Sequence, residues 1–152
     1  MNMSTSAYIT WTIHKKSQQI TWVEIIQFVL SKGWNLNVYG QMSYLPLDDN
    51  DMYNWQHEQI NEEKLFKILS DKDGLKEPLG VSITWKDSNI GGELLTLSDI
   101  EIMFSIAINR KTIPLTEEEV ITDVNWYLLN FNSIFSQIKD IVIISTNFSE
   151  SI

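Results

Sequence analysis

A strict alternation of side chains between residues 100 and 108 is the feature that most constrains how this chain can fold. Large apolar residues occupy every second position: Ile100, Ile102, Phe104, Ile106 and Ile108. A period of two residues is typical of a β-strand with one buried face. The intervening Met103, Ser105 and Ala107 are apolar or small, which predicts a central strand covered on both sides. The chain must therefore build a sheet around this strand.

Five further stretches predict strands. Residues 8–14 and 79–85 alternate apolar with polar side chains, and the strand at 93–97 follows a Gly-Gly pair that predicts a hairpin turn. Residues 35–45 also alternate, with a glycine on the apolar phase, which predicts a strand with a bulge. The sequence IVIIST at 141–146 is rich in β-branched side chains and predicts a final buried strand.

Helical periodicity appears in three places. A Thr-x-x-Glu capping box opens a helix predicted at 21–33, and an asparagine N-cap opens a short helix at 61–74. The sequence TEEE at residues 116–119 offers a second capping box, and the longest helix follows it, with an apolar face between residues 124 and 138.

The chain reads as one domain. Its 152 residues contain no internal repeat, no low-complexity linker and no shift of composition that would divide them. We expect a single domain over 1–152 with an ordered core at about 7–146 and frayed termini, including the final NFSESI. The order of elements predicts an α+β fold, with a mixed, largely antiparallel sheet of about five or six strands, two longer helices and one short helix packed on it.

Charge and cysteine content exclude several classes of function. Twenty acidic residues against eleven Lys and Arg give a formal net charge of −9, which disfavours direct binding to nucleic acid or to an anionic membrane. The chain has no cysteine, so disulfides, thiolate metal sites and a cysteine nucleophile are excluded. There is no signal-peptide pattern and no apolar run approaching the ~18 residues of a membrane span, so we expect a cytoplasmic protein.

The stretch LPLDDNDMYNWQHE at residues 45–58 concentrates acidic and aromatic side chains. An EF-hand loop would need oxygen ligands at its first, third and fifth positions, glycine at the sixth and glutamate at the twelfth. Read from Asp48, the fifth, sixth and twelfth positions hold Met52, Tyr53 and Gln59, so this pattern fails. We expect no structural metal here and no cofactor elsewhere.

No catalytic motif is present. The chain has only two histidines, without HExxH spacing, no GxSxG elbow and no glycine-rich phosphate loop. An enzyme whose active site is assembled from residues distant in sequence stays open as an alternative.

The acidic stretch suits a protein partner. Its carboxylates would attract a basic protein, and its aromatic side chains would act as anchors after docking. The predicted partner-binding residues are Asp48, Asp49, Asp51, Tyr53, Trp55 and Glu58. Two alternatives stay open: a solvated loop, and a small local core formed by Tyr53 and Trp55.

A small, acidic, cysteine-free and aromatic-rich α+β chain resembles the immunity proteins of bacterial toxin systems, including contact-dependent growth inhibition. The segments WKDSNIGGELLTLSD (85–99) and ITDVNWYLLNF (121–131) are similar to those families. The resemblance implies a non-enzymatic protein that neutralises a cognate toxin domain, commonly a nuclease, in the cytoplasm. A small enzyme and a generic protein-interaction module are the alternatives.

Overall fold

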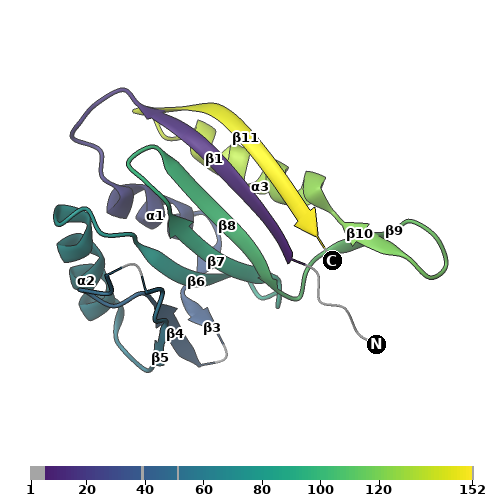
Figure 1. Ribbon diagram of the computed structural model, residues 1–152, viewed down its shortest axis with the longest axis horizontal. Helices are drawn as coiled ribbons and strands as arrows, with labels where there is room; N and C mark the ends of the chain where they lie inside the picture. Colours follow the sequence, from purple (N-terminus) through teal and green to yellow (C-terminus); the bar gives the residue numbers. More distant parts are fainter. Residues whose placement is uncertain (1–5, 39, 51, 152) are drawn as a thin grey trace.

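The computed structural model describes residues 6–38, 40–50 and 52–151 (Figure 1). It is an α+β domain with three helices, α1 (Trp22–Ser31), α2 (Glu62–Gly74) and α3 (Val124–Ser136). The strands are β1 (Ser6–Lys15), β2 (Trp34–Asn35), β3 (Asn37–Val38), β4 (Gln41–Tyr44), β5 (Gln56–Glu58), β6 (Gly80–Trp85), β7 (Gly91–Thr96), β8 (Glu101–Ile108), β9 (Thr112–Pro114), β10 (Val120–Thr122) and β11 (Ile141–Ser151).

Nine of the described strands form one sheet, in the order β11-β1-β8-β7-β6-β4-β3, with β2 paired to β6 and β5 paired to β4. Every pairing recorded in the described residues is antiparallel. The predicted count of five or six strands was therefore too low. The sheet was also predicted to be mixed, but its described strands are all paired antiparallel. The strands β9 and β10 form a separate two-stranded hairpin.

The single strand predicted at 35–45 is wrong, because this stretch contains three short strands. The backbone pairs Val38 with Gln41, so the chain reverses between β3 and β4. Gly40 lies in that turn with φ +81°, a left-handed conformation that glycine adopts without a side-chain penalty. Gly40, which was predicted to form a bulge within one strand, instead lies in the turn of a hairpin.

The turn predicted at Gly91 and Gly92 is also wrong. Both glycines belong to β7, and the chain turns before them, where the Trp85 N–H donates to the Ile90 carbonyl at 2.8 Å. A Cβ atom at Gly92 would overlap the Ser105 carbonyl oxygen on β8. The glycine is needed there for close approach of two strands.

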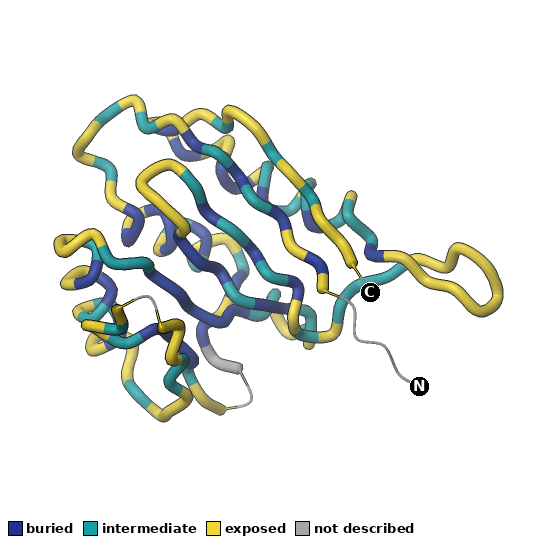
Figure 2. The backbone as a smooth tube through the Cα atoms, viewed as in Figure 1, coloured by how far each residue is buried: buried dark blue, intermediate teal, exposed yellow. Residues whose placement is uncertain are grey.

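The two faces of the sheet are covered unequally. The helices α1 and α3 lie behind the sheet in the view of Figure 1, and the strand segments that meet them are dark blue in Figure 2. On β8, Ile102, Phe104 and Ile106 are buried on that side, whereas Met103 is only partly buried and Ala107 is exposed. The prediction that this strand is covered on both sides is wrong, because the helices cover one face.

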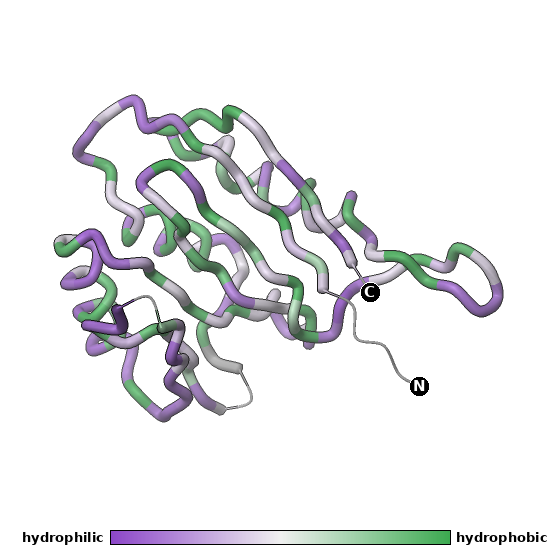
Figure 3. The backbone as a smooth tube through the Cα atoms, viewed as in Figure 1, coloured by the Kyte–Doolittle hydropathy of each residue, from purple (hydrophilic) through white to green (hydrophobic). Residues whose placement is uncertain are grey.

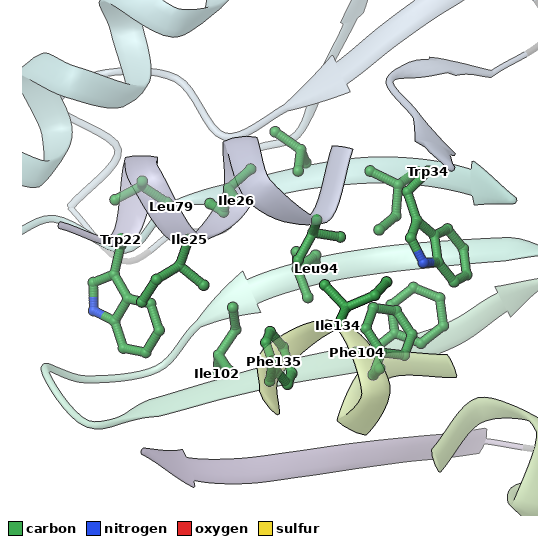
Figure 4. Close-up of a cluster of buried hydrophobic side chains, with 14 of the residues drawn as sticks. Trp22, Ile25, Ile26, Trp34, Leu79, Leu94, Ile102, Phe104, Ile134 and Phe135 are labelled. Atoms are coloured by element: carbon green, nitrogen blue, oxygen red, sulfur yellow. The ribbon is translucent and has the colours of Figure 1, made fainter. Parts of the chain in front are cut away.

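Aromatic side chains fill the space between this face and the helices, and Figure 4 shows part of the cluster. Trp34 stacks on Phe131 of α3, with ring centroids 4.8 Å apart. The indole of Trp34 donates to the Asn130 side chain at 2.9 Å, and the indole of Trp11 donates to Asn132 at 2.7 Å. Two asparagines of α3 thus satisfy the indole N–H groups that burial would otherwise leave unpaired.

The helix starts follow capping chemistry. Thr21 accepts from the Glu24 N–H at 3.1 Å, and Asn61 accepts from the Lys64 N–H at 2.8 Å, as predicted. Asp123 caps α3, so the TEEE sequence does not open this helix. The helix predicted to be short, α2, has 13 residues, as many as α3. Across the described ranges, no helix has the length and apolar character that crossing a bilayer requires.

The C-terminal strand departs from two predictions. Strand β11 continues to Ser151 and pairs with β1 along the whole length of that strand, so residues 147–151 are not frayed. It is the edge of the sheet, and Ile141 is its one buried residue. The sequence IVIIST was predicted to form a buried strand, but it belongs to this edge strand. Side chains branched at Cβ favour partly exposed strands as well as buried ones.

Candidate protein-interaction surface

Between β4 and β5, the described residues 45–50 and 52–55 form a loop, hereafter the acidic loop. The strands that flank it pair directly, with Tyr44 opposite Gln56 and Met42 opposite Glu58. The loop therefore leaves the sheet at the end of β4 and returns to it at the start of β5. The pairing of these two strands holds both ends of the loop.

The backbone of the acidic loop is strongly curved. Three residues that are not glycine adopt positive φ: Asp48 at +59°, Asn50 at +51° and Tyr53 at +51°. The Asp49 carboxylate accepts from the Asn54 N–H at 3.0 and 3.3 Å, which stabilises the turn. Asp49 thus shapes the loop, whereas Asp48 is exposed. Asp51, also predicted to bind the partner, lies outside the described residues.

A buried lysine clamps the start of the loop to α2. Lys72 is fully buried, and its ammonium donates to the Pro46 carbonyl at 2.6 Å and to Glu77 Oε1 at 3.2 Å. The same Glu77 oxygen accepts from the Asp48 N–H at 2.9 Å. One ammonium and one carboxylate therefore hold the loop and the C-terminal end of α2 together.

Sequence reasoning missed Lys72, although a signal was present. The residue lies seven positions after Leu65 and three after Leu69, which are both buried on the apolar face of α2. A lysine at such a position is either paired or snorkels to water. The helical periodicity could have identified Lys72 as a buried residue. Its hydrogen-bond partners, Pro46 and Glu77, could not be predicted from the sequence.

The two aromatic residues of the loop have different surroundings. Trp55 is partly buried beside Leu45, and its ring covers Gly80, where a Cβ atom would lie 2.9 Å from Trp55 Cη2. Tyr53 is 46% exposed and Met52 is 76% exposed. Tyr53 and Met52 are therefore the available anchors, while Trp55 packs on the sheet.

Glu58 lies on β5 beyond the loop and accepts a hydrogen bond from the Tyr44 hydroxyl. Burial, with the hydrogen bond to Glu58 and its negative charge, raises the pKa of Tyr44 to about 12. Glu58 is exposed, so it both holds the β4–β5 pair and adds a carboxylate to the surface.

Next to the acidic loop, Ser43 Oγ and His57 Nδ1 lie 2.7 Å apart. They are opposite each other on β4 and β5, a common arrangement for a cross-strand pair. On the same open face, Glu93 is half-buried; burial raises its carboxyl pKa and a protonated His57 would lower it. Ser43 is itself buried, with 8% of its surface exposed.

The described residues gather no three histidine or carboxylate side chains in a position to share a metal ion. That the chain binds no metal stays a prediction. In the comparisons with known proteins, no protein-family model, no curated protein and no solved structure matches the chain.

Proposed function

We propose that this chain is a non-enzymatic immunity protein, which binds a basic, nuclease-type toxin domain in the cytoplasm and covers its active site. The supporting observation is the acidic loop, which exposes Met52 and Tyr53 beside carboxylates while Lys72 holds its base. A pre-ordered loop loses less conformational freedom when it docks. The neighbouring charges would steer a basic partner and pair with its lysines and arginines.

Each predicted site residue that the structure describes has a place in this proposal. Asp48 and Glu58 meet the partner's cations, and Tyr53 is the aromatic anchor with Met52 beside it. Asp49 and Trp55 support the loop from within and contact the partner at most through their exposed edges.

Co-expression with the C-terminal domain of the protein encoded by the adjacent open reading frame tests the proposal. The wild-type chain should restore growth and co-purify with the toxin. Tyr53→Ala combined with Met52→Ala should speed dissociation, because anchors act after docking. Asp48→Lys should slow association and flatten its dependence on salt, whereas Asp140→Lys, at an exposed acidic position after α3, should change neither rate. Absence of both rescue and co-purification would refute the proposal.

A small hydrolase is the second candidate, and the Ser43–His57 contact is the observation that favours it. Substituting His57 with Ala separates the two candidates. An immunity protein should still protect cells from the toxin, whereas an enzyme that relies on this pair should lose its activity.

A further inference from the structure

The hairpin of residues 112–122, hereafter the arm, stands clear of the sheet and the helices (Figure 1). Its strands pair Thr112 with Thr122, and no described strand of the main sheet pairs with them. Four large aliphatic side chains of the arm are 39–58% exposed: Ile113, Leu115, Val120 and Ile121. Figure 3 shows hydrophobic stretches in the arm next to a hydrophilic one. A two-stranded hairpin with unburied aliphatic residues is marginal alone, so this arm suits docking.

The arm is ordered at its base. The Lys111 N–H donates to the buried Tyr127 hydroxyl at 2.8 Å, and Arg110 Nη1 donates to Thr122 Oγ1 at 2.8 Å. The Asp123 N–H donates to the Lys111 carbonyl, also at 2.8 Å. These contacts fix the direction in which the arm leaves the domain.

The tip of the arm is ordered as well. The Leu115 N–H donates to the Glu119 carbonyl at 2.8 Å, and Thr116 Oγ1 accepts from the Glu119 N–H at 3.0 Å. An arm held at both ends gives up little freedom on docking, which favours association.

On the helical side of the domain lies an open groove of about 380 Å³, whose apolar lining includes Trp85, Trp126, Leu129 and Ile134. Leu129 is 64% exposed there. Gly33, with φ +119°, lets the Trp85 ring lie against the backbone, since a Cβ atom would come within 2.8 Å of that ring. The groove thus presents aromatic and aliphatic surface to solvent.

Charge distinguishes the tip of the arm from the rim of the groove. Glu117, Glu118 and Glu119 are exposed, and within the described part of the chain none of them forms an ion pair. Lys32 lines the groove, and Lys86 Nζ lies 4.8 Å from the Trp85 ring centroid. Neither lysine pairs with a described carboxylate. The two lysines give this rim a positive charge that complements the acidic tip on a chain of net charge −9.

We infer that the arm of one copy lies in the groove of a second copy, reciprocally, to form a closed two-fold dimer. The arm extends roughly 13 Å from Thr112 to Thr116 at the strand rise. The groove follows α3 for roughly 16 Å between Trp126 and Gln137 at the helical rise. A chain that carries both halves of a complementary contact can satisfy them in a closed pair, with no free arm left over.

Sedimentation of the purified full chain tests this inference. The wild type should form a reversible dimer, twice the chain mass of 17.7 kDa, by about 100 µM, and added salt should weaken it. A tip variant, Glu117→Lys with Glu118→Lys, and a rim variant, Lys32→Glu with Lys86→Glu, should each dimerise at least ten-fold more weakly.

Mixing the two variants provides the sharpest measurement. The lysine tip of one then meets the glutamate rim of the other, and the glutamate tip meets the lysine rim, so a heterodimer should form. As a second variant, residues 113–121 are replaced by Asn-Gly, which closes the paired Thr112 and Thr122 with a two-residue turn. This armless chain should be monomeric with an unchanged circular dichroism spectrum of its helices. Asp140→Lys should dimerise like the wild type.

Three results would overturn the inference: a wild type that stays monomeric at about 200 µM, an armless chain that still dimerises, or charge variants that fail to pair when mixed. The acidic loop takes no part in this dimer. Failure here would leave the proposed toxin binding untouched, and failure of toxin binding would leave the dimer untouched.

Discussion

The acidic loop and the arm present similar chemistry and are attached to the domain in opposite ways. Both expose apolar side chains close in sequence to carboxylates: Met52 comes four residues after Asp48, and Leu115 two residues before Glu117. The acidic loop is fastened to α2 through Lys72 and packed on the sheet through Trp55. The arm is hydrogen-bonded at its base and its own tip, and its aliphatic residues remain exposed.

This difference shows that an exposed acidic and apolar segment can have either of two energetic roles. Lys72 and Trp55 hold the loop against the domain and stabilise the fold, so their substitution should destabilise the domain before it affects a partner. Residues of the arm contribute little to the fold of one copy, so their substitution should affect only association. Measurements of stability can separate the two.

The largest effect on stability is expected at Lys72, which holds the acidic loop against α2. Lys72→Met keeps the aliphatic length but removes both hydrogen bonds, leaving the Pro46 carbonyl and Glu77 without their cation. We expect a loss of about 3 kcal/mol in the free energy of unfolding, measured by urea titration. Lys64→Met, at an exposed position of the same helix, should change it by less than about 0.5 kcal/mol. Equal unfolding midpoints for the two variants would contradict the clamp.

Next come the two aromatic residues of the loop. Trp55→Ala should lower the free energy of unfolding by about 2 kcal/mol, because it uncovers Leu45 and Gly80. Tyr53→Ala should cost less than about 0.5 kcal/mol, because the ring is half exposed. Thermal unfolding of the pair provides the measurement. A Tyr53 variant as unstable as the Trp55 variant would place both rings in one local core.

A smaller effect concerns pH at the end of the loop. The folded-state pKa of Tyr44 is raised from 10.0 to about 12, so the folded protein holds this proton more tightly than the unfolded chain. The stability it adds is complete below pH 10 and is lost as the pH rises through 12. At pH 11 the loss should be about 1.4 kcal/mol relative to pH 9.

Tyr44→Phe has no proton to lose and is the matched control. The difference in unfolding free energy between wild type and this variant should shrink between pH 9 and pH 11. A difference that stays constant over this range would mean that Glu58 does not hold the Tyr44 proton in the folded state.

The smallest effect is expected for the arm. The armless chain, with Asn-Gly in place of residues 113–121, removes side chains that are mostly exposed. We expect its unfolding free energy, measured at a concentration where the chain is monomeric, to change by less than about 1 kcal/mol. A loss as large as that of Lys72→Met would show that the arm packs on its own domain.

Much of the fold could be predicted from local patterns. The alternation along β1 and β8 and the capped apolar periods of α1 and α2 each carry their own signal within about ten residues. The errors occurred where one local pattern fits two structures. Gly91-Gly92 suits a turn as well as a close strand contact, and TEEE suits a hairpin tip as well as a helix start. Neighbours distant in sequence made the choice in each case.

The sequence by itself determined the class of the domain and the chemistry of its surface, because periodicity, capping and net charge are local or additive properties. Only the tertiary structure decided what each acidic or aromatic residue does. Trp55 and Tyr53 differ because Gly80, 25 residues beyond Trp55 in the chain, leaves room for one ring against the sheet. Lys72 holds the acidic loop because Pro46 and Glu77 meet the ammonium of this fully buried side chain. The burial of a side chain and its hydrogen-bond partners depend on contacts between segments that are distant in sequence. No short stretch of sequence contains those contacts.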